Sequence, residues 1–207
     1  MKIRIPGVSL AAVIFISLTA CDDSTAELRG DQSEFGEIGV RITSTNTPAI
    51  LQGATAEITD LEDGVSVLSL TADFSEDDIE TIQQRLPAYD GKTTFDAKYR
   101  VTTEGVQSVY DDGTSFTLVK YDAKVGDKYT LKRNGQTLVR EVVQKSEEDD
   151  YLWNGWLLKT ITVKETGRAI PGFSNAKLVF NHRFGLVGYE MYFEDGSSEI
   201  IPIQLNY

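Results

Sequence analysis

Phe95-Asp96-Ala97-Lys98-Tyr99-Arg100-Val101-Thr102 decides the fold class of this 207-residue chain. Apolar residues occupy every second position of the stretch, and charged or polar residues stand between them. Successive side chains of a strand point to opposite faces, so the alternation predicts a strand with one buried and one solvated face. Strands of this kind are typical of antiparallel sheets.

Similar short runs follow to the end of the sequence, separated by turn signals. Asn134-Gly135 is the strongest of these signals, because both central residues of a type I′ turn need a positive φ. One or two strands are predicted between 48 and 74. The other predicted strands are 95–102, 115–121, 128–133, 136–143, 153–163, 177–181, 185–193 and 199–205. This pattern predicts a mainly β fold: an antiparallel curved sheet of about nine short strands, closed or half closed into a barrel.

One helix is predicted, at about 75–86. Ser75 can cap its first amides, and the acidic residues that follow favour the positive end of a helix. Three apolar residues share one face, namely Ile79, Ile82 and Leu86. Such a narrow apolar stripe covers one side of a sheet or closes one mouth of a barrel.

The first residues have the order of a secretory signal. Lys2 and Arg4 precede an apolar run over 8–18, and small residues follow at Thr19 and Ala20. The run is about half of the ~20 residues that a membrane-spanning helix needs. A cleaved signal peptide over 1–20 is therefore expected.

Leu18-Thr19-Ala20-Cys21 resembles the lipobox of bacterial lipoproteins. The resemblance implies cleavage before Cys21 and attachment of acyl chains, such as palmitate, to its thiol and new amino terminus. Cys21 is the only cysteine, so it has no disulfide partner in the chain. Several acyl chains would hold the protein on a membrane of the cell envelope. The residues after Cys21 leave open whether this is the inner or outer membrane, and whether the domain is periplasmic or surface exposed.

Composition divides the remainder into two parts. Residues 21–47 are rich in polar and acidic residues and are expected to form a flexible acidic tether. Residues 48–207 have the size of a single β-rich domain. Pieces of this domain, 121–131 and Phe184-Gly185-Leu186-Val187, resemble small β-rich envelope lipoproteins of unassigned function. The resemblance covers a minority of the domain and implies no activity.

Charge and residue types exclude several functions. The net charge is −12, which repels phosphate backbones and predicts no nucleic-acid partner. An acylated Cys21 leaves no thiol for catalysis, and the single histidine, His182, cannot form a His-pair metal motif. No cofactor and no metal site are predicted. Glu147-Glu148-Asp149-Asp150 lacks the spacing of a calcium loop and is expected to be a solvated loop.

The aromatic segment Tyr151-Leu152-Trp153-Asn154-Gly155-Trp156 is the candidate ligand-binding site. Exposed ring faces of Tyr151, Trp153 and Trp156 could stack on a sugar or line a hydrophobic pocket. The alternative places one tryptophan in the core and leaves the other half covered, because the two would point to opposite faces of a regular strand.

These observations predict a membrane-anchored, non-enzymatic envelope domain that binds a hydrophobic or glycan ligand or a protein partner. A structural or assembly accessory of the envelope without a small-molecule site is the alternative. A glycosidase-like enzyme stands third, since that chemistry needs only two suitably separated carboxyl groups.

Overall fold

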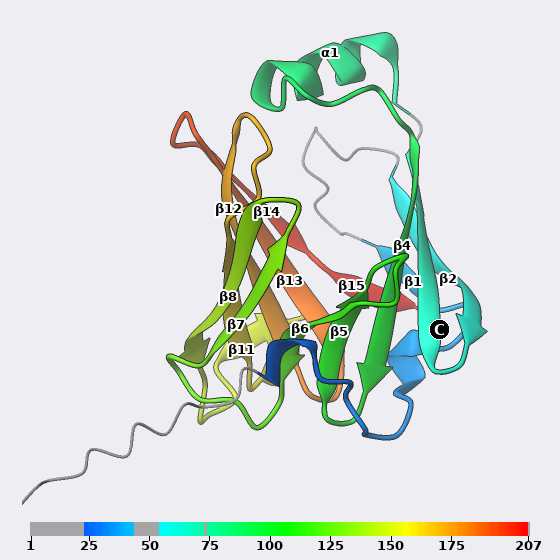
Figure 1. Ribbon diagram of the computed structural model, residues 1–207, viewed down its shortest axis with the longest axis vertical. Helices are drawn as coiled ribbons and strands as arrows, with labels where there is room; N and C mark the ends of the chain where they lie inside the picture. The colour runs from blue at the N-terminus through cyan, green and yellow to red at the C-terminus, as the bar shows by residue number, and fades with distance from the viewer. Residues whose placement is uncertain (1–22, 44–53, 73, 207) are drawn as a thin grey trace, which may run out of the picture.

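The computed structural model describes residues 23–43, 54–72 and 74–206, with no description of the Leu205 and Asp23 side chains. Strands dominate these residues, and every pair of neighbouring strands is antiparallel (Figure 1). The predicted mainly β, antiparallel fold is therefore confirmed. The predicted signal peptide and Cys21 lie outside the described residues.

Two large sheets make up the domain. The first has seven strands in the spatial order β15 (Gln204–Asn206), β1 (Arg41–Thr43), β2 (Thr55–Glu62), β3 (Val65–Thr71), β4 (Thr94–Thr102), β5 (Gly105–Val109) and β6 (Ser115–Lys120). The second has six strands in the order β14 (Ser198–Pro202), β13 (Gly185–Phe193), β12 (Phe173–Asn181), β11 (Ile161–Thr166), β8 (Gln136–Lys145) and β7 (Lys128–Arg133).

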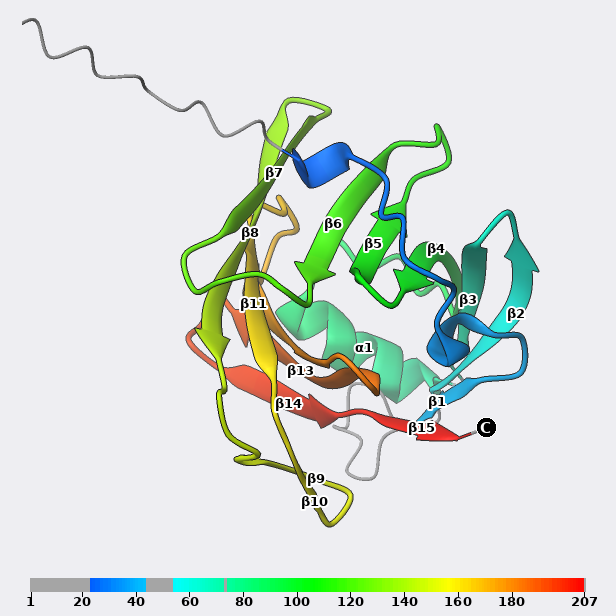
Figure 2. The ribbon, with the colours of Figure 1, turned by 90° about the horizontal axis from the view of Figure 1, so that it is seen from below.

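The two sheets curve toward each other and form the sides of an open ring (Figure 2). At one seam β14 runs directly into β15, and at the other seam β6 lies beside β7 without joining its ladder. The fold is thus a half barrel in the described part of the chain. Asn134 and Gly135 have φ values of 51° and 75°, as the predicted β7–β8 hairpin requires.

Helix α1 (Glu76–Arg85) links β3 to β4 and lies across one end of the ring (Figures 1 and 2). Ser75 caps it as predicted: the Ser75 hydroxyl accepts from the Asp78 amide, and the Asp78 carboxylate accepts from the Ser75 amide. Ile82 packs with Phe193 of β13 in a small cluster of its own. The helix therefore closes one mouth of the half barrel.

The main core fills the space between the sheets. Its apolar side chains come from β4, β5 and β6 on one side and from β7, β8, β11 and β12 on the other. Phe116, Val142 and Val163 have no exposed surface. Because this interior is packed, a ligand site has to lie at a mouth of the ring or outside it.

One arginine joins the two sheets across the core. Arg140 of β8 is 1% exposed, and its Nε donates to the Glu165 carboxylate at 2.6 Å. Its Nη1 donates to the carbonyl oxygens of Phe116 and Thr117 on β6, at 2.9 and 3.1 Å. Arg168 supplies a second cation to Glu165. The side chain thus supplies hydrogen bonds at the seam where β6 and β7 do not pair.

The described part of the predicted tether is folded. It contains the short 3-10 helices η1 (Asp23–Thr25) and η2 (Glu34–Gly36) and the strand β1, and it buries Leu28 and Val40. The fully buried Gln107 holds it in place: its Oε1 accepts from the Leu28 amide at 3.0 Å, and its Nε2 donates to the Ala26 carbonyl at 2.6 Å. A flexible tether is therefore wrong for 23–43, because β5 satisfies backbone groups that local composition would leave to water.

The strand prediction also needs correction in number and in one place. The described residues contain fifteen strands. The predicted strand 153–163 is three strands, because β9 (Tyr151–Trp153) and β10 (Trp156–Leu158) form a hairpin before β11. Asn154 and Gly155 have φ values of 49° and 81°, and they form its turn.

Candidate functional site

The hairpin separates the three predicted aromatic ligand contacts. Trp153 belongs to a small core cluster with Val179 and Val187, on the outer side of the second sheet. Its ring lies against Phe184 with centroids 4.8 Å apart, and its Nε1 donates to the Ile203 carbonyl at 2.5 Å. Trp153 is therefore a packing residue and offers no free ring face.

Trp156 and Tyr151 lie in different surroundings. Trp156 pairs with Trp153 across the hairpin but is 71% exposed. Tyr151 is half-buried over the second sheet, where burial, followed by the charge of Glu190, raises the pKa of its hydroxyl. The three rings do not converge on one pocket. The alternative reading, with one tryptophan in the core, describes Trp153 correctly.

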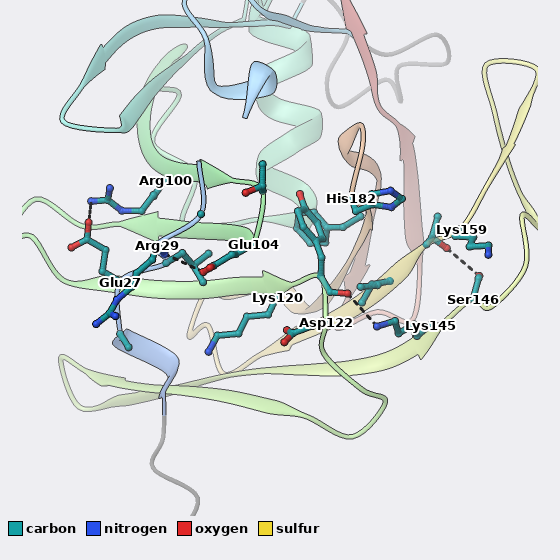
Figure 3. Close-up of a pocket in the computed structure, with 18 residues that line it drawn as sticks. Glu27, Arg29, Arg100, Glu104, Lys120, Asp122, Lys145, Ser146, Lys159 and His182 are labelled. Atoms are coloured by element: carbon teal, nitrogen blue, oxygen red, sulfur yellow. Dashed lines mark hydrogen bonds and ion pairs between the residues drawn. The ribbon is translucent and has the colours of Figure 1, made fainter. Parts of the chain in front are cut away.

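A cleft with a volume of about 1310 Å³ lies at the mouth of the half barrel opposite α1 (Figure 3). Typical small-molecule sites measure about 300–1,000 Å³, so the cleft has room for a sizeable ligand. Its lining comes from the N-terminal segment and from the ends of strands of both sheets: residues 26–30, 120–122 and 159–161, with Arg100, Thr103, Glu104, Lys145, Ser146, Phe180 and His182.

The N-terminal segment forms one wall of this cleft. Gln107 fixes its backbone at Ala26 and Leu28, and the Glu104 carboxylate accepts from the Arg29 amide at 3.1 Å. Gly30 packs so closely that a Cβ there would lie 2.7 Å from the Thr103 hydroxyl oxygen. The wall is therefore a fixed part of the site.

Two polar atoms in residues that line this cleft lack a partner. Among the described residues, the Tyr121 hydroxyl and the Arg100 Nε are the buried side-chain atoms without a hydrogen bond. Burial raises the pKa of Tyr121 to about 12, so its hydroxyl is neutral and remains a donor. Buried polar groups are normally satisfied, and an exception needs an explanation such as a water, ion or ligand.

Charged side chains gather at two ends of the cleft. Figure 3 shows Arg100, Glu27 and Arg29 at one end, and Lys145 with Lys159 at the other. Arg100 Nη2 lies 2.9 Å from the Glu27 carboxylate. His182 lines the second end and is exposed. The Lys145 ammonium donates to the carbonyl oxygens of Tyr121 and Ala123, which holds it over the end of β6.

The buried carboxylate of Glu165 is occupied by arginines. It is the one acidic side chain among the described residues that is buried, and Arg140 and Arg168 both bind it. Burial by itself would raise the pKa of Glu165, but the two arginines outweigh it and hold that pKa below its usual range. Glu165 thus has no second buried carboxyl group beside it for glycosidase chemistry.

In the described ranges, no group of three or more His, Cys, Asp or Glu side chains is placed to bind a metal ion. No helix of the described segments combines the length and hydropathy that crossing a bilayer requires.

The chain matches no family model, no curated protein and no solved structure in comparisons with known proteins. A function for this chain is therefore inferred from the cleft and its chemistry.

Proposed function

We propose that this protein is a lipoprotein of the bacterial cell envelope that binds a ligand in the cleft at the mouth of its half barrel. The domain is non-enzymatic, and acyl chains on Cys21 hold it to a membrane. The Leu18-Thr19-Ala20-Cys21 lipobox resemblance supports the anchor. The cleft supports the binding role.

A single observation carries the binding role. The two unpartnered buried polar atoms of the described residues, on Tyr121 and Arg100, both belong to residues of the same cleft. Two unpartnered polar atoms in unrelated places would be two local packing defects. Their occurrence in residues of one large cleft supports a bound molecule that supplies the missing hydrogen bonds.

The distance to the anchor supports a function at the membrane surface. Asp23 follows Cys21 by two residues, so their Cα atoms are at most about 8 Å apart. Residues of the cleft begin at Ala26. An acylated Cys21 would therefore hold this mouth of the domain close to the lipid headgroups, and a ligand could pass between bilayer and cleft over a short path.

The anchor is tested by replacing Cys21 with serine. Wild-type protein should incorporate an alkynyl palmitate analogue and sediment with membranes, and Cys21→Ser should do neither. Ser17→Ala, in the apolar part of the signal, is the matched control and should behave as wild type. Mature Cys21→Ser protein that stays tightly bound to membranes would refute the anchor.

The binding role is tested by native mass spectrometry of protein purified from its own envelope. A mass above that of the acylated chain should report a retained ligand, and Tyr121→Phe should lower its occupancy. Tyr192→Phe is the control, because that hydroxyl already accepts a hydrogen bond from Lys177 at 2.8 Å, away from the cleft. Absence of any retained molecule in wild type would contradict the proposal.

The accessory alternative has one observation in its favour. Three apolar side chains of the β9–β10 hairpin are largely exposed: Leu152 and Trp156 at 71% and Leu157 at 57%. Adjacent exposed apolar groups of this kind are typical of protein contact sites. A photo-crosslinking amino acid at Trp156 in intact cells would capture a neighbour protein if this reading is right, and the same probe at Lys132 should not.

A further inference from the structure

The cleft is positively charged although the protein is strongly acidic. Its lining contains five Lys and Arg residues and three Asp and Glu residues, whereas the whole chain has a net charge of −12. Local cations in a molecule of opposite overall charge attract a small anionic group and leave larger polyanions repelled by the remaining surface.

Of the three acidic residues of the lining, one pairs with a cation and one with a neutral backbone amide. Glu27 binds Arg100, and Glu104 accepts from the Arg29 amide. Asp122 is the third acid, and Figure 3 shows it near Lys145. The ammonium of Lys145 donates only to neutral carbonyl oxygens, so its charge is not cancelled by those bonds. Lys145 and Lys159 therefore make the end of the cleft beside β8 its cationic end.

Apolar side chains of the main core form the floor beneath these cations. Ile161 and Phe180 belong to the core cluster between the sheets, and Tyr121 packs against it. Leu28 of the N-terminal wall is buried beside them. A glycan would need exposed ring faces to stack on, and Phe180 is 2% exposed. The floor is therefore apolar and presents no exposed ring face to a sugar.

We propose that the ligand of this cleft is an anionic amphiphile: an acyl chain on the apolar floor with a phosphate or carboxylate headgroup at Lys145 and Lys159. This proposal rests on the binding role proposed above and names its ligand class. Tyr121 lines the same cleft, and its neutral hydroxyl is a donor without a partner. A membrane phospholipid and a free fatty acid share this chemistry, and the experiment separates them.

The test uses the acylated protein in nanodiscs of phosphatidylcholine, from which native mass spectrometry ejects the protein with its tightly bound lipids. Three probes are added in turn at equal mole fraction: dioleoylphosphatidic acid, oleic acid and dioleoylglycerol. Dioleoylglycerol has the acyl chains of the first probe without its phosphate, so it is the matched neutral ligand. Preferential retention of phosphatidic acid or of oleate identifies the headgroup source.

Two variants and a control assign the effect to the cleft. Lys159→Glu and Lys145→Glu should each lower retention of the anionic probe by about tenfold, because attraction becomes like-charge repulsion. Lys132→Glu makes the same charge change on an exposed residue of β7 outside the cleft and should change retention less than twofold. Lys145 also donates to two carbonyl oxygens, so Lys145→Glu could destabilise the fold. If that variant does not fold, Lys159→Glu, which loses no such bond, is the deciding variant.

The outcomes separate this proposal from the binding role. Equal retention of dioleoylglycerol and the anionic probes would overturn the proposal that the ligand is anionic. An equal loss of probe retention in Lys132→Glu and Lys159→Glu would overturn it as well. In either case, a ligand retained from the native envelope would still support the binding role. Retention of none of the probes together with a native ligand of another class also overturns it. No native ligand and no retained probe would overturn both proposals.

Discussion

Replacing Arg140 with methionine should lower the free energy of unfolding by about 3–5 kcal/mol, the usual cost of removing one partner of a buried ion pair. Methionine keeps much of the aliphatic stem but none of the donors. The structure shows what is lost: the bond to Glu165, two bonds to carbonyl oxygens of β6, and a 3.2 Å bond from Nη2 to the Ser108 hydroxyl.

The magnitude follows from the groups left behind. Each buried acceptor that loses its donor costs about 1–3 kcal/mol. Glu165 keeps Arg168, whose side chain is 42% exposed and therefore replaces only part of the lost attraction. For a chain of this size about 2–4 °C of melting temperature corresponds to 1 kcal/mol, so the midpoint should fall by about 6–20 °C.

The loss should depend on pH in a defined direction. The pKa of Glu165 is lowered in the folded protein, so its stabilising contribution is present above its ordinary value of 4.5 and is lost as pH falls through the lower folded value. Without Arg140, burial favours the protonated carboxyl of Glu165, so lowering the pH reduces the free energy of unfolding of the variant less than that of wild type. The stability gap between wild type and Arg140→Met should therefore narrow as pH drops below about 4.5.

Urea unfolding followed by circular dichroism at several pH values measures this gap. Arg41→Met is the control: Arg41 also pairs with a glutamate on a neighbouring strand, Glu57 at 3.0 Å, but it is 66% exposed. It should cost at most about 1 kcal/mol. If Arg140→Met costs no more than Arg41→Met, or if its cost does not change with pH, the cross-sheet role of Arg140 is refuted.

Three further outcomes are expected. Ser75→Ala should cost about 1 kcal/mol in urea unfolding, because the α1 cap is lost, and full stability would show that the cap contributes nothing. Gly172→Ala should cost several times more than Gly113→Ala in the same assay: both glycines have a positive φ, but a Cβ at Gly172 would lie 1.8 Å from a carbonyl oxygen of α1, while nothing lies within 4 Å at Gly113. In Trp156→Phe the remaining fluorescence should resist acrylamide quenching, because Trp153 is 9% exposed; easy quenching would contradict its packing in the core.

The elements that the sequence predicted correctly depend on short-range signals. Two-residue alternation indicated β4, the φ requirement of Asn134-Gly135 indicated the β7–β8 hairpin, and the capping residues indicated α1. Asn154-Gly155 carries the same turn signal as Asn134-Gly135. The apolar residues on both sides of this turn nevertheless resemble one continuous strand, so the sequence predicts a single strand and a single aromatic site that contains both tryptophans.

The cleft could not be predicted because its parts are distant in the sequence. Gln107 forms hydrogen bonds with the backbone of residues 26 and 28, about eighty positions away in the chain. No local sequence pattern predicts these bonds. Lys145 is the last residue of β8, beyond the predicted strand 136–143, and Lys159 precedes β11 inside the stretch wrongly predicted as one strand. Their common place at one mouth depends on the pairing of β8 with β11 in the sheet. Residues 21–47 contain few apolar residues, and this composition predicts a tether. It gives no sign of the hydrogen bonds that Gln107 supplies to their backbone.

The folding of residues 23–43 onto the domain changes what an anchor at Cys21 would do. A long tether would leave the orientation of the domain free and every face equally far from the lipids. With the domain beginning at Asp23, the acyl chains would hold one mouth of the half barrel at the headgroups and leave α1 at the far end. That mouth carries the cationic end of the cleft. An acidic surface elsewhere and a basic mouth beside the bilayer together favour one orientation, in which the cleft receives its ligand from the membrane.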